Sequence, residues 1–257
     1  MSLAEEDLLS VKLRHRQGSL RMAVEFRLAA PWTVLFGPSG SGKSTVLRAI
    51  AGFVRPEEGR IVCCRSERVL LSTAERIFVP PHLRPVRSAG QTARLFPSMR
   101  VRENVAYGLG WRSQSESRAN AQEVVEEVLS IFRLSTLAQR RPGDLSGGER
   151  QRASVARAVV SAVTFEGAER ALLLLDEPFS GLDGALRDEL AISLREYLAR
   201  WKVPALSVSH DVGEAFLLRA EVIRIAEGRV TAQGPVEVVL GAERDRLLMG
   251  LRGPASV

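Results

Sequence analysis

The 257-residue sequence is poor in cysteine and histidine, and this shortage excludes two kinds of site. The only cysteines are Cys63 and Cys64. Neighbouring side chains of a strand point to opposite faces, so we expect no structural disulfide between them. The three histidines, His15, His82 and His210, lie far apart, and no Cys/His cluster has the spacing of metal ligands. The sequence therefore predicts neither a disulfide scaffold nor a structural metal site.

Long apolar runs are also missing. No run of about 18 apolar residues is present, so no segment is expected to span a membrane. The longest apolar stretch, Ala171–Leu175, has the length of a buried strand. The first ten residues are acidic and lack the apolar centre of a secretory signal. We therefore expect a cytosolic protein with one large α/β domain.

Lysine is the rarest of the charged residues. Of the 36 basic residues, only Lys12, Lys43 and Lys202 are lysine. The net charge is +6, but the basic residues are spread along the chain without a long basic run. A basic surface suits nucleic acid, an anionic membrane or plain solvation, and this even spread favours solvation, so we expect no nucleic-acid partner. A lysine kept at position 43 indicates a site where a compact ammonium fits and a planar guanidinium does not.

Hydrophobic periodicity and turn residues predict strands that alternate with helices. The predicted strands are 8–14, 20–28, 32–36, 61–64, 69–71, 171–176, 204–209 and 221–226. The predicted helices are 43–51, 101–109, 120–133, 149–160, 184–200 and 211–219. The first two strands are expected to pair antiparallel. Three prolines predict an irregular connection over 79–90, and the last twenty or so residues are expected to form a short helix and a tail.

Residues 37–45 read Gly-Pro-Ser-Gly-Ser-Gly-Lys-Ser-Thr and fit the phosphate-loop pattern G-x-x-x-x-G-K-[ST]. The loop follows a predicted strand and precedes a predicted helix, a context that argues against a chance Gly-rich turn. Its glycines free backbone N–H groups to wrap phosphates. We expect Lys43 to reach the β- and γ-phosphates and Ser44 to ligate Mg²⁺. The predicted nucleotide-binding residues of this loop are Gly37, Pro38, Ser39, Gly40, Ser41, Gly42, Lys43, Ser44 and Thr45.

A second motif is the pair of carboxylates that ends the apolar stretch before Pro178. Asp176 is placed to hold Mg²⁺, and Glu177 can polarise an attacking water as a general base. Alone, this pair would read equally well as an exposed acidic turn after a core strand. Together with the phosphate loop it predicts nucleotide hydrolysis.

A third motif, Leu-Ser-Gly-Gly-Glu-Arg-Gln-Arg, lies between the other two. Ser146, Gly147 and Gly148 would expose amide N–H groups at the start of a helix, which is a second cradle for polyphosphate. A chain with a complete phosphate loop has little use for a second cradle on the same nucleotide. We therefore expect these three residues to bind the ATP of a second copy of the chain, in a head-to-tail dimer.

These motifs, in this order, resemble the ATP-binding subunit of an ABC transporter, and the match runs along nearly the whole chain. The resemblance implies an α/β fold: a P-loop NTPase core with a mixed sheet, an antiparallel β edge and an inserted α-helical subdomain. It also implies a division of the chain. The nucleotide-binding core would be 1–91 and 162–240, the helical subdomain with the signature motif 92–161, and a short tail 241–257.

The resemblance implies roles for three further residues. His210, in the run Ser-His-Asp after a predicted strand, would be the switch histidine that contacts the γ-phosphate and the attacking water. Asp183 would end a loop, Ser180–Asp183, that couples the two nucleotide sites of the dimer. Gln91 would sense Mg²⁺ and the γ-phosphate, and so joins Ser44 and Asp176 as a predicted metal ligand.

The sequence also departs from the family in three places. The run Val86–Gly90, just before Gln91, lacks the apolar strand that related chains carry, and its polar residues and glycine are poor in a central strand. The connection Ser161–Arg170 is longer than usual. No adenine-stacking aromatic is evident in the first strands, although His15 lies near the expected place.

By the same resemblance the chain would hydrolyse ATP to drive uptake through a membrane permease, docked beside residues 91–107 and supplied by a substrate-binding protein. It would then be cytoplasmic and peripheral on the inner face of the cell membrane. The segments 80–84 and 93–97 are most similar to molybdate-type importer ATPases, with sulfate, polyamine and iron uptake as alternatives. Many such ATPases carry a further C-terminal regulatory domain, for which this sequence is too short.

Two other classes of function remain open at this point. One is a soluble ABC ATPase of DNA repair, chromosome structure or translation, although the sequence shows no long coiled coil, zinc element or tandem ATPase domain. The other is a nucleotide switch without catalysis. The intact residues Lys43, Asp176, Glu177 and His210 favour catalysis over that alternative.

Overall fold

The computed structural model describes residues 7–64, 67–109, 118–165 and 171–251. Its strands are β1 (Leu9–Gln17), β2 (Leu20–Leu28), β3 (Trp32–Phe36), β4 (Glu58–Cys63), β5 (Arg68–Ser72), β6 (Ile77–Phe78), β7 (Val86–Ala89), β8 (Leu172–Asp176), β9 (Ala205–Ser209), β10 (Glu221–Ala226) and β11 (Arg229–Pro235). Its helices are α1 (Lys43–Ala51), α2 (Val101–Ala106), α3 (Arg118–Ile131), α4 (Gly147–Val163), α5 (Gly184–Arg200), α6 (Val212–Leu217) and α7 (Val236–Leu251). Short 3₁₀ turns connect some of these elements.

All the described strands belong to one mixed sheet, in the order β6-β5-β4-β1-β2-β11-β10-β3-β9-β8-β7. The half that runs from β10 to β7 is parallel. The half formed by β1, β2, β4, β5 and β6 is antiparallel. Strand β11 joins them, because it pairs antiparallel with β10 and meets β2 through the single pair Arg229 and Ala23.

The parallel half brings the predicted motifs to one edge of the sheet. Strands β3, β9 and β8 are neighbours, and in their register Phe36 lies beside Ser209 while Asp176 lies beside Val208. The chain leaves β3 into the phosphate loop, β8 into Glu177 and β9 into His210. The carboxyl ends of parallel strands are where open α/β sheets bind ligands. The phosphate loop, the Asp-Glu pair and the Ser-His-Asp run, which are far apart in sequence, therefore meet at this edge.

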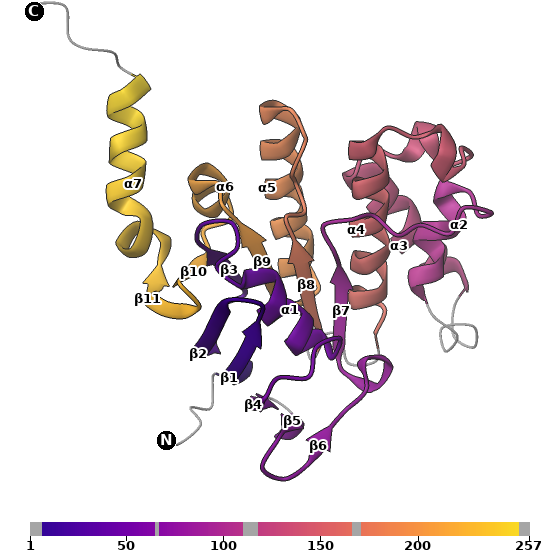
Figure 1. The fold of residues 1–257 in the computed structure, drawn as a ribbon. Helices are drawn as coiled ribbons and strands as arrows, with labels where there is room; N and C mark the ends of the chain where they lie inside the picture. The colour runs from indigo at the N-terminus through magenta and orange to yellow at the C-terminus, as the bar shows by residue number, and fades with distance from the viewer. Residues whose placement is uncertain (1–6, 65–66, 110–117, 166–170, 252–257) are drawn as a thin grey trace, which may run out of the picture.

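Alternate residues of β8 show how the sheet is covered on both faces. Leu172 and Leu174 belong to a buried cluster that includes the apolar side of α1 and the inner face of the antiparallel strands. Leu173 and Leu175 belong to a second cluster, with residues from the helices α2 to α7. In Figure 1, α2, α3 and α4 gather on one side of the molecule and α7 lies on the other. A strand that is buried on both faces explains the unbroken leucine run.

Residues 86–89, which we predicted to be irregular, form strand β7. The prediction was wrong because β7 is the last strand of the sheet and pairs only with β8. Val86 and Ala89 point into the core, and the guanidinium of Arg87 lies 4.3 Å from the centre of the Phe165 ring. An edge strand tolerates such a sequence because one side of its backbone needs no partner strand.

The C-terminal part of the chain also differs from expectation. The hairpin partner β11 was not predicted, and the last helix is longer than predicted, because α7 extends from Val236 to Leu251. The domain boundary drawn after residue 240 thus falls within α7, and the one drawn after 161 falls just before the end of α4. The division into core, helical subdomain and tail otherwise stays a prediction. Residues 166–170 of the long connection lie outside the described residues.

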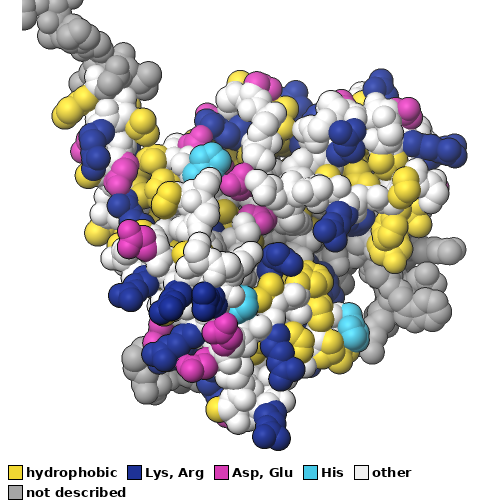
Figure 2. Space-filling model, in the orientation of Figure 1, with side chains coloured by type: hydrophobic (Ala, Val, Ile, Leu, Met, Phe, Trp, Pro, Cys, Tyr) yellow, Lys and Arg dark blue, Asp and Glu magenta, His cyan; other side chains and the backbone are white. Residues whose placement is uncertain are grey.

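Two expectations from composition can be checked directly. Neither Cys63 nor Cys64 forms a disulfide. In the part of the chain that the structure describes, no helix combines the length and the apolar character needed to cross a bilayer. On the face shown in Figure 2, basic side chains are scattered among acidic, apolar and uncharged ones.

Candidate functional site

The phosphate loop is held in a shape that only glycine permits at two positions. Gly37 has φ 153°, and a Cβ there would lie 2.0 Å from the carbonyl oxygen of Ile225. Gly42 is the N-cap of α1 with φ 101°, and a Cβ there would lie 2.8 Å from Sδ of Met22. The loop therefore packs directly on β10 and β2, with its backbone close enough to wrap a phosphate.

Lys43 turns its ammonium back over this loop. Its Nζ donates to the carbonyl oxygens of Gly37 and Pro38, both at 2.7 Å, and the side chain is buried. Burial lowers the pKa of Lys43, while the nearby carboxylates of Glu177 and Asp176 act in the opposite direction. The ammonium is thus held in the bend of the loop, where a phosphate oxygen could replace the carbonyl oxygens as its partner.

Ser44 and Asp176 meet across the gap between α1 and β8. The Ser44 hydroxyl donates to Oδ1 of Asp176 at 3.0 Å. Burial raises the pKa of Asp176; the Ser44 hydrogen bond and the charge of Lys43 lower it, and Glu177 adds to the rise. Within the described ranges, no three His, Cys, Asp or Glu side chains are grouped to hold a metal. A hydroxyl beside a carboxylate nevertheless fits Mg²⁺, which binds through few protein oxygens together with water and phosphate.

Glu177 is the centre of a small cluster. It has φ 49°, an unusual backbone conformation for a residue with a side chain. One of its carboxylate oxygens, Oε2, accepts from Nε2 of Gln91 at 3.2 Å. The other, Oε1, lies 3.4 Å from Nδ1 of His210. Two residues that were predicted from separate motifs thus touch the same carboxylate.

Gln91 reaches Glu177 because its backbone is anchored at the end of β7. The side-chain amide of Gln151, in α4, donates to the carbonyl oxygen of Gly90 at 3.1 Å. The irregular sequence before Gln91 therefore does not displace it from the site. The side-chain amide of Gln91 donates to Glu177. Among the described residues, no hydrogen bond joins Gln91 to Ser44 or Asp176, the other two residues predicted to hold the metal.

The signature motif lies apart from this cluster. Ser146 is the N-cap of α4: its hydroxyl accepts from the Glu149 N–H at 3.2 Å, and its own N–H donates to the Glu149 carboxylate at 2.6 Å. Gly147 and Gly148 form the first turn of the helix. In the described residues, no hydrogen bond links Ser146 to the phosphate loop.

The loop Ser180–Asp183 lies beside the signature motif. A Cβ on Gly148 would come within 3.3 Å of Leu182. Asp183 is the N-cap of α5 and accepts from the Leu186 N–H at 3.0 Å. The predicted site residues thus form two groups: one around Lys43, Asp176 and Glu177, and the other at the starts of α4 and α5.

A family comparison agrees with this arrangement. The protein-family model described as "ABC transporter" matches residues 24–180. This range includes the phosphate loop, the signature motif and the Asp-Glu pair. The chain belongs to the ABC transporter family. The signature motif, the phosphate loop and the Asp-Glu strand end are therefore features of that family in this chain.

Two curated members of the ABC transporter family are similar over most of the chain. The molybdenum import ATP-binding protein ModC of Mesorhizobium japonicum is 39% identical over 231 residues, which are 90% of this chain and 59% of that protein. ModC of Rhodospirillum rubrum is 38% identical over 233 residues, which are 91% of this chain and 60% of that protein. The chain thus spans about three fifths of the length of these relatives.

Solved ABC structures show the same fold. The dimeric post-hydrolysis ATP-binding cassette MJ0796, bound to ADP and Pi, has a TM-score of 0.71 at 23% identity and covers 89% of this chain and 98% of its own. The cbiO1 protein of Clostridium perfringens, part of the ABC transporter complex cbiONQ, has a TM-score of 0.74 at 23% identity and covers 97% and 96%. The predicted P-loop NTPase fold with a mixed sheet is therefore confirmed.

Sequence reasoning missed three residues near the site. Gln17, at the end of β1, accepts a hydrogen bond from the Thr45 hydroxyl. Glu214 is buried beneath the His210 loop, and Arg187 joins α5 to Asp211. Asp211 and Glu214 have the spacing of a helix N-cap and its third residue, which is a signal that could have marked this turn. Gln17 and Arg187 had no comparable signal.

A groove opens next to Gln91, between α1, β7 and α4. It encloses about 620 Å³. Three arginines, Arg48, Arg94 and Arg157, line it together with Phe53, an exposed apolar side chain. The groove therefore combines positive charge with an apolar surface.

Proposed function

We propose that the chain is the ATP-hydrolysing subunit of an importer and works as a head-to-tail dimer beneath a membrane permease. The observation that carries this proposal is the cluster at Glu177, whose two carboxylate oxygens contact Gln91 and His210. A general base needs such fixed orientation and a place beside the phosphates. The phosphate loop supplies that place at the end of β3, which is separated from β8 by β9 alone.

The catalytic roles follow from these contacts. Lys43 exchanges the loop carbonyls for β- and γ-phosphate oxygens and neutralises part of their charge. Glu177 accepts a proton from the attacking water. His210 keeps its carboxylate in position, and Gln91 does so until the metal binds. Mg²⁺, held by Ser44 and Asp176 with Gln91 as a third ligand, would supply positive charge to the phosphate oxygens. Gln91 has to leave Glu177 to reach the metal, so its side chain can report whether nucleotide is bound.

The second copy of the chain would complete each site. Ser146, Gly147 and Gly148 lie in the other group of residues, and their N–H groups at the start of α4 favour an anion. A head-to-tail dimer would place them on the γ-phosphate held by the partner's phosphate loop. The Ser180–Asp183 loop, which runs from a contact with Glu177 to the start of α5, would then connect one site to the other.

The groove beside Gln91 is the proposed docking site of the permease. Arg48, Arg94 and Arg157 favour an acidic side chain, and Phe53 favours an apolar one. A cytosolic helix with an acidic residue on an apolar face meets both needs. Because Gln91 lines the same groove, the position of that helix would respond to the state of the nucleotide.

We infer that the cargo is molybdate or a similar oxyanion. This rests on the two ModC relatives, which are molybdenum import ATP-binding proteins. The same names favour transport over the alternative of a soluble ATPase of DNA repair or translation. A substrate-binding protein would deliver the oxyanion, and the ATPase would be peripheral on the cytoplasmic face of the membrane.

Replacement of the general base tests the catalytic part. In Glu177→Gln we expect ATP to bind and the dimer to be trapped, while turnover falls by about 10² to 10⁴, the contribution of a general base. Glu58→Gln, a change to an exposed residue far from the site, is the matched control and should leave turnover unchanged. Turnover of Glu177→Gln close to that of wild type would remove Glu177 from the base role.

Purification from detergent-solubilised membranes tests the transport part. We expect a multi-span permease to copurify with the native protein and to be lost when Arg48 and Arg94 are both changed to Glu. An oxyanion can then be identified from the binding protein that serves that permease. Recovery of the native protein free of membranes, or with nucleic acid, would contradict the assignment.

A further inference from the structure

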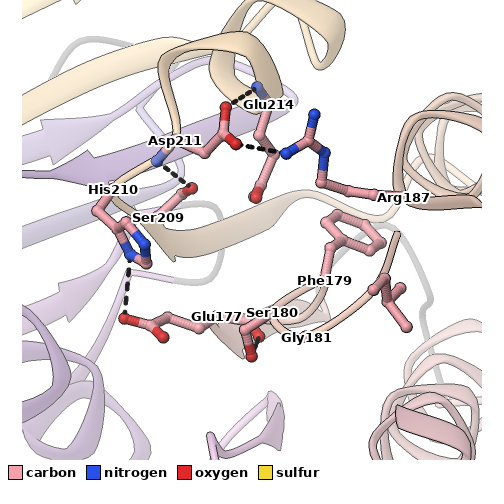
Figure 3. Close-up of a pocket in the computed structure, with 10 residues that line it drawn as sticks. Glu177, Phe179, Ser180, Gly181, Arg187, Ser209, His210, Asp211 and Glu214 are labelled. Carbon is pink, nitrogen blue, oxygen red and sulfur yellow. Dashed lines mark hydrogen bonds and ion pairs between the residues drawn. The ribbon is translucent and has the colours of Figure 1, made fainter. Parts of the chain in front are cut away.

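Behind His210 lies a small pocket that the proposed mechanism does not use. It encloses about 180 Å³ and is bounded by the loops after β8 and β9 and by the starts of α5 and α6. Figure 3 shows Glu214 and Arg187 on one side of it and Glu177 with Ser180 on the other. Glu214 is the least expected of these residues, because it is an acid whose side chain is enclosed by the fold.

Glu214 is only 5% exposed, and its Oε1 has no hydrogen-bond partner among the described residues. Burying an ionised carboxylate with an unpaired oxygen costs much free energy, whereas burying the neutral carboxylic acid costs much less. Burial raises the pKa of Glu214 to about 7; Ser209 and Arg187 lower it, and Asp211 and Glu177 add to the rise. The carboxyl thus holds its proton well above the pH at which an ordinary glutamate loses it.

The backbone of Glu214 belongs to the network that shapes the His210 loop. Its N–H donates to Oδ1 of Asp211 at 3.0 Å, and the Asp211 N–H donates to the Ser209 hydroxyl at 3.1 Å. From α5, Nη1 of Arg187 donates to Oδ2 of Asp211 at 2.5 Å. These are the dashed contacts above His210 in Figure 3. The residues on both sides of His210 are therefore fixed by α5 and α6.

His210 itself has little support. Its side chain is 65% exposed, and its ion-pair distance to Glu177 is 3.4 Å. Because most of the His210 side chain is exposed, the position of its ring depends on the loop that carries it. Any charge that enters the pocket below the loop would act on Asp211 and Glu177 as well, since both carry negative charge.

We propose that Glu214 is a positioning residue: as a neutral carboxylic acid it lets the first turn of α6 pack beneath the Ser209–Asp211 loop and so keeps His210 against Glu177. Ionisation of Glu214 would place a second negative charge among Asp211, Glu177 and His210, with Arg187 as the cation that faces it. Turnover should then fall as the pH rises through neutrality. This inference rests on the proposed ATPase function.

Two substitutions at this position separate charge from packing. Glu214→Gln keeps the shape and cannot ionise, whereas Glu214→Ala removes both the shape and the polar group. Glu243→Gln, which removes a carboxylate from a partly buried pair with Arg224 elsewhere in the fold, is the matched control. Thermal unfolding of each variant shows whether it is folded before any activity is compared.

The first measurement is ATP turnover between about pH 6 and pH 8.5, the range that brackets the raised pKa. At the acid end, we expect the kcat of Glu214→Gln to equal that of wild type within about twofold. Toward the alkaline end, the kcat of Glu214→Gln divided by that of wild type should rise about fivefold or more. Glu214→Ala should lose about tenfold in kcat with little change in KM, as a misplaced catalytic group does. Equal pH profiles for wild type and Glu214→Gln would overturn the proposal.

The second measurement does not depend on turnover. In ¹³C NMR of glutamate carboxyl groups, wild type should show one carboxyl that titrates near neutrality and that is absent from Glu214→Gln. If Glu214 titrates in the ordinary acid range, the inference fails even when ATP is hydrolysed. If the titration is seen but the wild type does not hydrolyse ATP, the proposed function fails instead.

Discussion

Arg84 is a cation enclosed by the fold, and no carboxylate among the described residues pairs with it. It is 1% exposed, and its guanidinium donates to the carbonyl oxygens of Val79 at 2.7 Å, Ala49 at 2.9 Å, Ile50 at 2.7 Å and Leu70 at 3.2 Å. Burial lowers its pKa to about 10, so it remains charged at neutral pH. Two of the four acceptors are in the last turn of α1, where a helix leaves carbonyl oxygens free. Arg84 therefore ties the end of the phosphate-loop helix to β5.

We expect Arg84→Met to lower the free energy of unfolding by about 3 kcal/mol or more, because it removes the side-chain donor from four buried carbonyl groups, of which those of Ala49 and Leu70 keep a backbone N–H partner. Urea unfolding measures this. Arg60→Met is the control: Arg60 forms a half-exposed ion pair with Glu75, and such pairs contribute about 1 kcal/mol or less. A loss at Arg84 no larger than the loss at Arg60 would show that water replaces the guanidinium at these carbonyls.

At the scale of elements, local patterns located most of the sheet and its helices. Strand β3, helix α1, helix α5 and strand β10 begin and end where the sequence predicted. Each has a strong local signal, such as an apolar run before a Gly-rich loop or a helix that begins after an aspartate cap. Strand β11 also had a sequence signal that was overlooked, the glycine at position 228. In the structure Glu227 and Gly228 both have positive φ, as a two-residue hairpin turn requires.

Other elements depend on distant partners and could not be read locally. Strand β7 exists because β8 offers its edge and Phe165 covers Arg87, and neither fact is visible in residues 86–89. The same holds for the site. The phosphate loop and the Asp-Glu pair are contiguous motifs, so their residues were predicted, whereas Gln17, Arg84 and Glu214 owe their positions to contacts between elements.

Helix α4 allows a test that separates folding from partner binding. Ser146 caps the helix through Glu149, so Ser146→Ala should cost about 1 kcal/mol of stability. Ser146→Asp keeps a capping side chain and should cost less, but it adds negative charge where we propose the partner's γ-phosphate binds. We expect the Asp variant to be as stable as wild type and yet to form no ATP-dependent dimer, measured by light scattering in a Glu177→Gln background. A normal dimer would contradict the proposed role of the signature motif.

At the scale of the whole molecule, the two groups of site residues cannot serve one nucleotide within one chain if the dimer is head-to-tail. This predicts complementation between two inactive variants. Each site of such a dimer combines Lys43 of one chain with Ser146 of the other. A mixed dimer of Lys43→Ala and Ser146→Asp therefore has one site with both defects and one site with neither. In a Glu177→Gln background, the mixture should retain about a quarter of the ATP that the parent retains, because half of the dimers are mixed. Separate samples should retain almost none.

Retention by the mixture no greater than by the separate samples would show that Lys43 and Ser146 act on the same chain's nucleotide. Gly241→Ser, at a position with open space around a Cβ and far from both groups, is the control partner. When Gly241→Ser is mixed with Lys43→Ala, two kinds of dimer should retain ATP. They are the dimers of Gly241→Ser alone and the mixed dimers, each of which has one intact site.

The scarcity of lysine has a consequence for how the folded chain can be cut. Lys12 lies in β1, which is paired on both sides, and Lys43 is buried in α1. Lys202 is exposed, with φ 53°, in the turn between α5 and β9. A lysine-specific protease should therefore nick the native protein first at that turn. The nick leaves Glu177 and His210 on different fragments, which are held together by non-covalent contacts such as the pairing of β9 with β8 and β3.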